Sequence, residues 1–270
     1  MRIFYLLLVW MLSSAVSADL VLGVHPYLEP GNLKKRFQPL AEYLSSELET
    51  TVEVRVAQDY QSHIEAIGND EIDIAYLGPS IYVKVTDDYG EKPILARIEN
   101  AGQSTFNGYI VIRADSNLQQ LSDLKGKFFA FGDKNSTMSS LVPQAMLLEQ
   151  GITLDKLSGY QFYKGHKNVA LAVLAGDADA GAVKEEVFHN LRNKGLKALA
   201  RSPDISEHLF ITRSNMDISM IHRIRHLLLR LRSPEEVKSL LQPIKPGLTG
   251  MTPASDIDYD NLRKLMKLLK

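Results

Sequence analysis

The feature that most constrains the fold is an alternation of strand-like and helix-like segments that runs through the chain twice. Short apolar segments such as 20–24 and 72–77 predict buried strands, whereas apolar residues three or four positions apart predict a helix over 33–48. The alternation restarts near residue 121, with a strand at 128–131 and a helix that ends before Gly151. Two such runs predict an α/β fold with two lobes rather than one long sheet.

The order of the segments also predicts where the chain divides. Lobe 1 is expected to contain residues 19–110 together with 210–270, and lobe 2 residues 111–209. The segments 108–111 and 209–212 are the expected crossings, about which the lobes would hinge. Beyond Met216 the pattern predicts a helical C-terminal tail, interrupted by a loop over 243–253.

Polar and aromatic residues follow the predicted strands, at the edge where open α/β sheets bind ligands. The turns in question come after Val24, Leu77, Phe131, Tyr163 and Val183. If two lobes face each other, these turns meet in the cleft between them. At or beside these turns stand Tyr27, Tyr76, the hydroxyl-rich stretch 136–140, His166, Glu185 and Glu186.

The stretch G-D-K-N-S-T-M-S-S at 132–140 is the most specific of these candidates. It joins the strand 128–131 to a helix, and the first N–H groups of a helix lack intrahelical partners at the positive end of its dipole. Clustered hydroxyls beside such donors favour a tetrahedral oxyanion. Taken alone, the pattern favours ordinary helix capping over an anion site, so a second signal is needed.

Residues 1–18 have the pattern of a secretory signal peptide. Arg2 precedes an apolar run over 3–12, and Val16-Ser17-Ala18 is a small-residue cleavage site. The run is short for a membrane anchor, so cleavage after Ala18 is expected. The chain has no cysteine, which excludes lipid-modified cysteine and disulfides. Together these features predict export to a bacterial periplasm without disulfide bonds.

Composition and motif searches disfavour several classes of function. A net charge of -1, from 31 basic and 32 acidic residues, offers no basic field for nucleic acid. No catalytic residue, cofactor or metal site is predicted, because the nucleophile-elbow, zinc-protease and phosphate-loop motifs are absent. His222 and His226 have a metal-like spacing, but neighbouring arginines favour a solvated basic face. His25, His63 and His189 are expected to be structural or surface groups.

Three segments in order resemble one known family. D-I-A-Y-L-G-P at 73–79, G-D-x-N-S-T at 132–137 with L-V-P at 141–143, and G-H at 165–166 with A-L-A-V-L-A-G at 170–176 look like the periplasmic phosphate/phosphonate-binding proteins of ABC importers. The resemblance covers the whole chain beyond residue 18. It implies the type II two-lobe periplasmic binding fold, which closes on its ligand by a hinge.

The resemblance also implies which residues bind the ligand. Ser136 and Thr137 match the residues that donate hydrogen bonds to the phosphorus oxyanion, and Ser139 stands for a displaced third hydroxyl. Glu186 falls where an acid receives a ligand's amino group, but His208 stands where a second acid is expected. Phosphate and phosphite are therefore as well supported as an aminoalkylphosphonate. His166 and Tyr76 also match the family pattern, and Tyr27 is added from its turn.

The predicted function is capture of a small phosphorus oxyanion by a monomer that delivers it to an inner-membrane ABC permease. A sensory module for a membrane receptor or histidine kinase is the alternative. A hydrolase or phosphatase is a third and weaker possibility, since no catalytic motif supports it.

Overall fold

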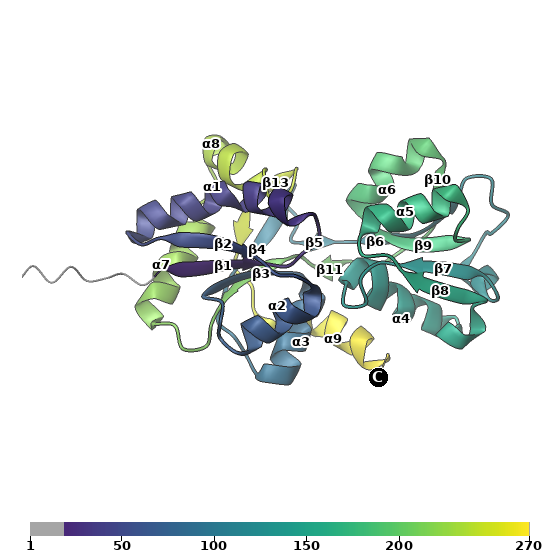
Figure 1. The fold of residues 1–270 in the computed structure, drawn as a ribbon, viewed down its shortest axis with the longest axis horizontal. Helices are drawn as coiled ribbons and strands as arrows, with labels where there is room; N and C mark the ends of the chain where they lie inside the picture. The colour runs from purple at the N-terminus through teal and green to yellow at the C-terminus, as the bar shows by residue number, and fades with distance from the viewer. Residues whose placement is uncertain (1–18, 270) are drawn as a thin grey trace, which may run out of the picture.

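A computed structural model describes residues 19–269, so the predicted signal peptide lies outside the described part of the chain. The described residues form two α/β lobes, and strands β5 (Thr105–Phe106) and β11 (Ile205–Ser206) run between them (Figure 1). The predicted two-lobe α/β architecture is therefore confirmed. Within residues 19–269 no helix combines the length and apolar character needed to cross a membrane.

Lobe 1 is built on a six-stranded mixed sheet in the order β13-β4-β12-β3-β1-β2. Strand β1 pairs parallel with β2 and β3, whereas β12 and β13 run antiparallel to their neighbours. The strands are β1 (Leu20–Val24), β2 (Val52–Val56), β3 (Ile74–Leu77), β4 (Ile94–Asn100), β12 (Leu209–Thr212) and β13 (Leu248–Thr252). The helices α1 (Pro30–Leu48), α2 (Tyr60–Gly68), α3 (Pro79–Tyr89) and α7 (Ile218–Leu229) belong to this lobe.

Lobe 2 has a five-stranded mixed sheet in the order β10-β6-β9-β7-β8. Its strands are β6 (Gly108–Arg113), β7 (Phe128–Phe131), β8 (Gly159–Phe162), β9 (Ala180–Lys184) and β10 (Leu196–Arg201). Its helices are α4 (Val142–Glu149), α5 (His166–Ala175) and α6 (Glu185–Leu191). Short turns complete the described chain: η1 (Leu121–Leu124), η2 (Thr137–Leu141), η3 (Leu154–Lys156), η4 (Arg192–Lys194), α8 (Pro234–Glu236), η5 (Val237–Leu241) and η6 (Asp256–Tyr259).

The chain crosses between the sheets a few residues earlier than the expected crossings. Strands β5 (Thr105–Phe106) and β11 (Ile205–Ser206) pair with each other in a small antiparallel sheet. All of β6 then belongs to the second sheet, and all of β12 to the first. The crossing strands are only two residues long, so hydrophobic periodicity could not predict them, and the crossings were expected in the longer apolar strands that follow.

The predicted loop over 243–253 is wrong in part. Residues Leu248–Thr252 form β13, the edge strand of the lobe 1 sheet, paired antiparallel with β4. Gly250 in the middle of this short segment weakens its strand pattern, and the segment forms a strand by pairing with β4.

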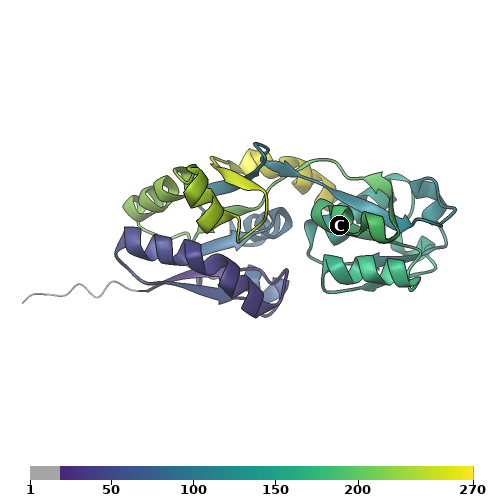
Figure 2. The ribbon, with the colours of Figure 1, turned by 90° about the horizontal axis from the view of Figure 1, so that it is seen from above.

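The C-terminal helix α9 (Asp260–Lys267) packs on α3 of lobe 1 and on α4 of lobe 2 (Figure 2). Its buried Leu262 and Met266 join an apolar cluster that includes Tyr82 of lobe 1 and Met146 of lobe 2. On the polar side Arg263 binds Asp256 and Asp260. The helical tail was predicted, but its position across both lobes follows from these contacts alone.

Candidate functional site

A cavity lies between the lobes where the carboxyl ends of several strands meet. All five turns singled out in the sequence contribute to its lining, together with residues from the two crossings and the tail. Its volume of about 60 Å³ suits a compact solute of a few non-hydrogen atoms. The lining residues are His25, Tyr27, Arg36, Tyr60, Tyr76, Gly78, Ser80, Phe106, Ser136, Thr137, Met138, His166, Lys184, Glu186, His208, Ile244 and Lys245.

The hydroxyl-rich turn owes its shape to a close backbone approach. The Gly132 amide donates to the Ser139 carbonyl oxygen at 2.8 Å, and a Cβ on Gly132 would lie 2.0 Å from the Ser139 hydroxyl oxygen. Asp133 accepts from the Asn135 amide at 2.8 Å and so fixes the turn. The helix that follows opens with one π-type turn, η2, which brings Thr137 and Met138 to the cavity.

Ser136 and Thr137 line the cavity, whereas Ser139 lies behind them. The buried Ser139 hydroxyl donates to Ser136 Oγ at 2.8 Å, so the Ser136 proton is directed elsewhere. Thr137 Oγ1 accepts from the Ser80 amide at 3.1 Å and donates to the Ser80 hydroxyl at 2.8 Å. The turn of lobe 2 therefore touches the start of α3 in lobe 1, and Ser139 is placed as a support rather than a lining residue.

His166 has its tautomer fixed by a neighbouring strand. The Lys184 amide donates to His166 Nδ1 at 3.0 Å, which leaves the ring proton on Nε2. Burial, and then the positive charge of Lys184, lower the pKa of His166 to about 3. His166 is thus a neutral hydrogen-bond donor at the cavity rather than a cation.

The lobe 1 side of the cavity is a stack of rings around Tyr76. The Tyr76 ring lies 5.5 Å from His208 and 5.6 Å from His25 in stacked geometry, and 4.9 Å from Phe37. Burial is the main cause that raises the pKa of Tyr76 far above its usual value. Tyr76 therefore stays a neutral phenol. Tyr27 lies at the same wall and donates to the Ile244 carbonyl at 3.4 Å.

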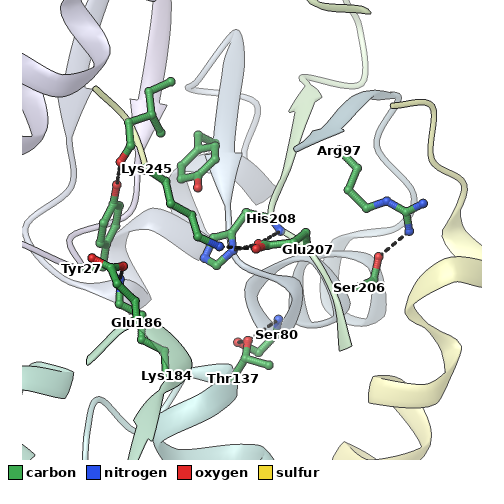
Figure 3. Close-up of polar contacts among 12 residues, drawn as sticks. Tyr27, Ser80, Arg97, Thr137, Lys184, Glu186, Ser206, Glu207, His208 and Lys245 are labelled. Carbon is green, nitrogen blue, oxygen red and sulfur yellow. Dashed lines mark hydrogen bonds and ion pairs between the residues drawn. The ribbon is translucent and has the colours of Figure 1, made fainter. Parts of the chain in front are cut away.

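Two carboxylates lie beside the cavity, and each is paired with a lysine (Figure 3). Glu186 binds Lys184 at 2.7 Å. Glu207 is fully buried, forms an ion pair with Lys245 and accepts from His208 Nδ1 at 2.9 Å. The sequence had marked position 208 as lacking the second acid, but the neighbouring Glu207 brings a carboxylate to this wall.

Several lining residues were not among the sequence candidates. Lys184 directly follows a predicted strand, and Ser80 lies three residues after another, so the search of turns at strand ends was sufficient to find them. His25 also directly follows a predicted strand, and it is buried in the ring stack as well as lining the cavity. No local pattern marks Arg36, on α1, or Lys245, in the predicted loop. Only the folded chain brings these two cations to the cavity.

Among residues 19–269 no group of three or more histidine, cysteine, aspartate or glutamate side chains is arranged to hold a metal ion. His222 and His226 lie on α7, away from the cavity. The nearby Arg225 donates to the Ile94 carbonyl at 2.6 Å and so ties α7 to the sheet.

Comparison with known proteins gives a consistent result. Residues 22–259 match the model of a family described as the periplasmic phosphonate substrate-binding protein of ABC transporters. The phosphate-import protein PhnD of Mycolicibacterium smegmatis is 28% identical, over 90% of this chain and 84% of that protein. The phosphonates-binding periplasmic protein of Escherichia coli is 24% identical, over 87% of this chain and 72% of that protein.

A solved structure supports the fold. PhnD1 of Prochlorococcus marinus, in complex with methylphosphonate, superposes with a TM-score of 0.82 at 20% identity and covers 93% of this chain and 98% of that one. The family model spans nearly all of the described residues, from the first strand to the start of the C-terminal helix. The chain therefore belongs to the family of periplasmic phosphonate substrate-binding proteins of ABC transporters, which are solute-binding proteins rather than enzymes.

Proposed function

We propose that this protein captures a small phosphorus oxyanion, such as phosphate, phosphite or a simple phosphonate, and delivers it to an ABC permease. The observation that carries the proposal is the cavity in which the hydroxyl-rich turn of lobe 2 faces the cations and rings of lobe 1. The related proteins that import phosphate or bind phosphonates support this ligand class.

Ser136 and Thr137 are proposed to bind the oxyanion together with the first N–H groups of their helix. The Ser136 oxygen accepts from Ser139, and the Ser136 hydroxyl exchanges its contact with the Tyr60 phenol for the ligand. Thr137 exchanges its contact with Ser80 for the ligand. Neutral donors in a largely buried site hold a charged oxygen strongly, since hydrogen bonds to charged groups contribute about 1.5–3 kcal/mol each.

His166, Tyr76 and Tyr27 complete the proposed contacts, with His166 Nε2 and the Tyr76 phenol as further donors. Tyr27 exchanges its contact with the Ile244 carbonyl for the ligand. Arg36 adds charge: its guanidinium donates to the Ile244 carbonyl at 3.3 Å and forms no carboxylate ion pair within residues 19–269. Because each of the two carboxylates at this wall is paired with a lysine and the cavity histidines are held neutral, the charge of Arg36 is left in surplus. Binding of an anion would neutralise this surplus positive charge.

The protein is proposed to act as a periplasmic monomer, exported by residues 1–18. We further propose that the two lobes close about β5 and β11, so that the lobe boundaries lie at these crossings, a few residues before the expected positions 110 and 209. The importer function is favoured over the sensory alternative by the family match.

Titration calorimetry with phosphate, phosphite and methylphosphonate tests the proposal. The double substitution Ser136→Ala with Thr137→Ala is expected to weaken binding by several kcal/mol, following the contribution of each charged hydrogen bond. Ser158→Ala, an exposed serine of the same lobe, serves as the matched control and is expected to bind as the unchanged protein does. Unaltered affinity in the double variant would show that the Ser136 and Thr137 hydroxyls do not bind the oxyanion.

A further inference from the structure

The buried carboxylate at the cavity wall already holds a cation from the chain itself. Glu207 has no exposed surface, and its two oxygens are used by Lys245 and by the backbone N and Nδ1 of His208, the latter two at 3.0 and 2.9 Å. Although burial opposes ionisation, the hydrogen bond from His208 and the charge of Lys245 lower the pKa of Glu207 to about 2. Glu207 is therefore an anion whose partners are internal.

The second carboxylate of the cavity has the same arrangement. Glu186 is bound by Lys184 at 2.7 Å. Burial works against its ionisation, but the Lys184 charge and hydrogen bond leave its pKa lowered. The Lys184 ammonium also lies 5.8 Å from the Tyr27 ring centre, and the Lys245 ammonium 5.7 Å from that of Phe106. Each ammonium thus lies near an acid and an aromatic ring.

A carboxylate next to an aromatic ring forms a binding site for the ammonium group of a ligand, through an ion pair and a cation–π contact. In this cavity both such places are filled by lysines. A ligand ammonium entering the cavity would meet like charges at close range, and the repulsion between like charges is strong where burial lowers the effective dielectric constant. To reach Glu207 it would have to displace Lys245 from a buried ion pair, which is strongly unfavourable.

We infer that Lys245 and Lys184 make the cleft selective for oxyanions that carry no amino group. The inference rests on the proposed function and narrows its ligand class to phosphate, phosphite and unaminated alkylphosphonates. Lys245 is the principal specificity-determining residue, because its partner is fully buried, whereas Glu186 is partly exposed.

The test compares ethylphosphonate with 2-aminoethylphosphonate, which differ by one amino group. Calorimetry on the unchanged protein is expected to show at least tenfold tighter binding of ethylphosphonate. Equal or tighter binding of 2-aminoethylphosphonate would overturn the inference and leave the proposed function in place. If neither compound binds, nor phosphate, phosphite or methylphosphonate, the proposed function fails and this inference with it.

Variants assign the discrimination to the lysine. Lys245→Ala frees the Glu207 carboxylate. The variant is expected to bind 2-aminoethylphosphonate more tightly, which reduces the preference for ethylphosphonate over 2-aminoethylphosphonate by tenfold or more. Adding Glu207→Gln is expected to reverse most of that gain, because the freed charge is gone. Lys238→Ala, an exposed lysine nearby in sequence, is the matched control and should leave the preference as it is.

Thermal melts show whether each variant is folded before it is titrated. A folded Lys245→Ala protein that keeps the full preference for ethylphosphonate would contradict the role of Lys245. If that variant does not fold, the comparison of the two ligands on the unchanged protein decides the inference.

Discussion

The two walls of the cavity are built from different chemistry. On the lobe 1 side, Tyr76 and His25 are almost wholly buried in a stack of rings that continues into the core beneath. On the lobe 2 side, Ser136 and Thr137 stand on a turn held by hydrogen bonds among small side chains. The first wall is part of the packing of its lobe, whereas the second depends on a few directed contacts.

Because the two walls differ in this way, substitutions in them should affect different properties of the protein, the stability of the fold in one case and ligand affinity in the other. Truncation of a buried ring removes dispersion and hydrophobic contacts and leaves a cavity. Loss of a hydroxyl in a polar turn removes one donor and little volume. Substitutions in the lobe 1 wall should therefore lower the free energy of unfolding most, and those in the lobe 2 turn should mainly lower ligand affinity.

The largest effect is expected for Tyr76→Ala. The ring packs on Phe37 and Phe210 with centroids 4.9 and 5.0 Å away, so its removal should lower the free energy of unfolding by about 3–5 kcal/mol, as for other buried aromatic residues. Urea unfolding measures this loss. Tyr76→Phe, which keeps the ring, is the control, and a similar loss in both variants would contradict the packing explanation.

The next largest effect is expected for Gly132→Ala, which should lower both the free energy of unfolding and the affinity for the oxyanion. The added Cβ would lie 2.0 Å from Ser139 Oγ and 2.7 Å from Ser139 Cβ, so the turn has to move. We expect a loss of stability of about 1–3 kcal/mol, as for overpacked sites, and a loss of oxyanion binding. Gly31→Ala, where nothing lies within 4 Å, is the matched control in unfolding and calorimetry. Normal binding by Gly132→Ala would show that the close approach is dispensable.

Lower pH should lower the free energy of unfolding through the buried histidines, of which His63 lies in lobe 1 and His166 in lobe 2. His63 is fully buried behind Tyr76, and burial lowers its pKa to about 4. Below pH 6.5 the unfolded chain binds protons that the folded His63 does not, so stability is complete above pH 6.5 and falls progressively towards pH 4.

The expected loss from His63 at pH 5 is on the order of 1–2 kcal/mol, since each pKa unit corresponds to about 1.4 kcal/mol. Urea unfolding at pH 7 and pH 5 measures it, and His63→Gln should reduce the slope. A slope unchanged by His63→Gln would assign the pH dependence to other groups.

The smallest effect is expected for Ser139→Ala. It removes the hydroxyl that donates to Ser136 Oγ, and one such neutral hydrogen bond contributes about 0.5–1.5 kcal/mol. Affinity for phosphate should fall severalfold, because Ser136 loses its fixed orientation, with little change in the melting temperature. An affinity loss as large as that of Ser136→Ala with Thr137→Ala would instead indicate direct contact between Ser139 and the ligand.

Most of the fold was accessible from the sequence. Strands 20–24 and 128–131 and the helix before Gly151 were predicted from periodicity and chain breakers, and each is present. The turn argument also predicted which loops meet at the cavity. Strand β13 was missed because its pattern is weak and its partner is far away in sequence.

Local features follow from the sequence alone: the alternation of strands and helices, the polar turns at strand ends, and the hydroxyl cluster at 136–140. Long-range contacts in the folded chain bring Lys245 and Arg36 to the cavity, bury Glu207 against Lys245, and place Ser139 behind Ser136. Hydrogen-bonded turns and amphipathic periodicity depend on neighbouring residues. Ion pairing and burial depend on contacts between segments that are distant in sequence, such as the 38 positions between Glu207 and Lys245.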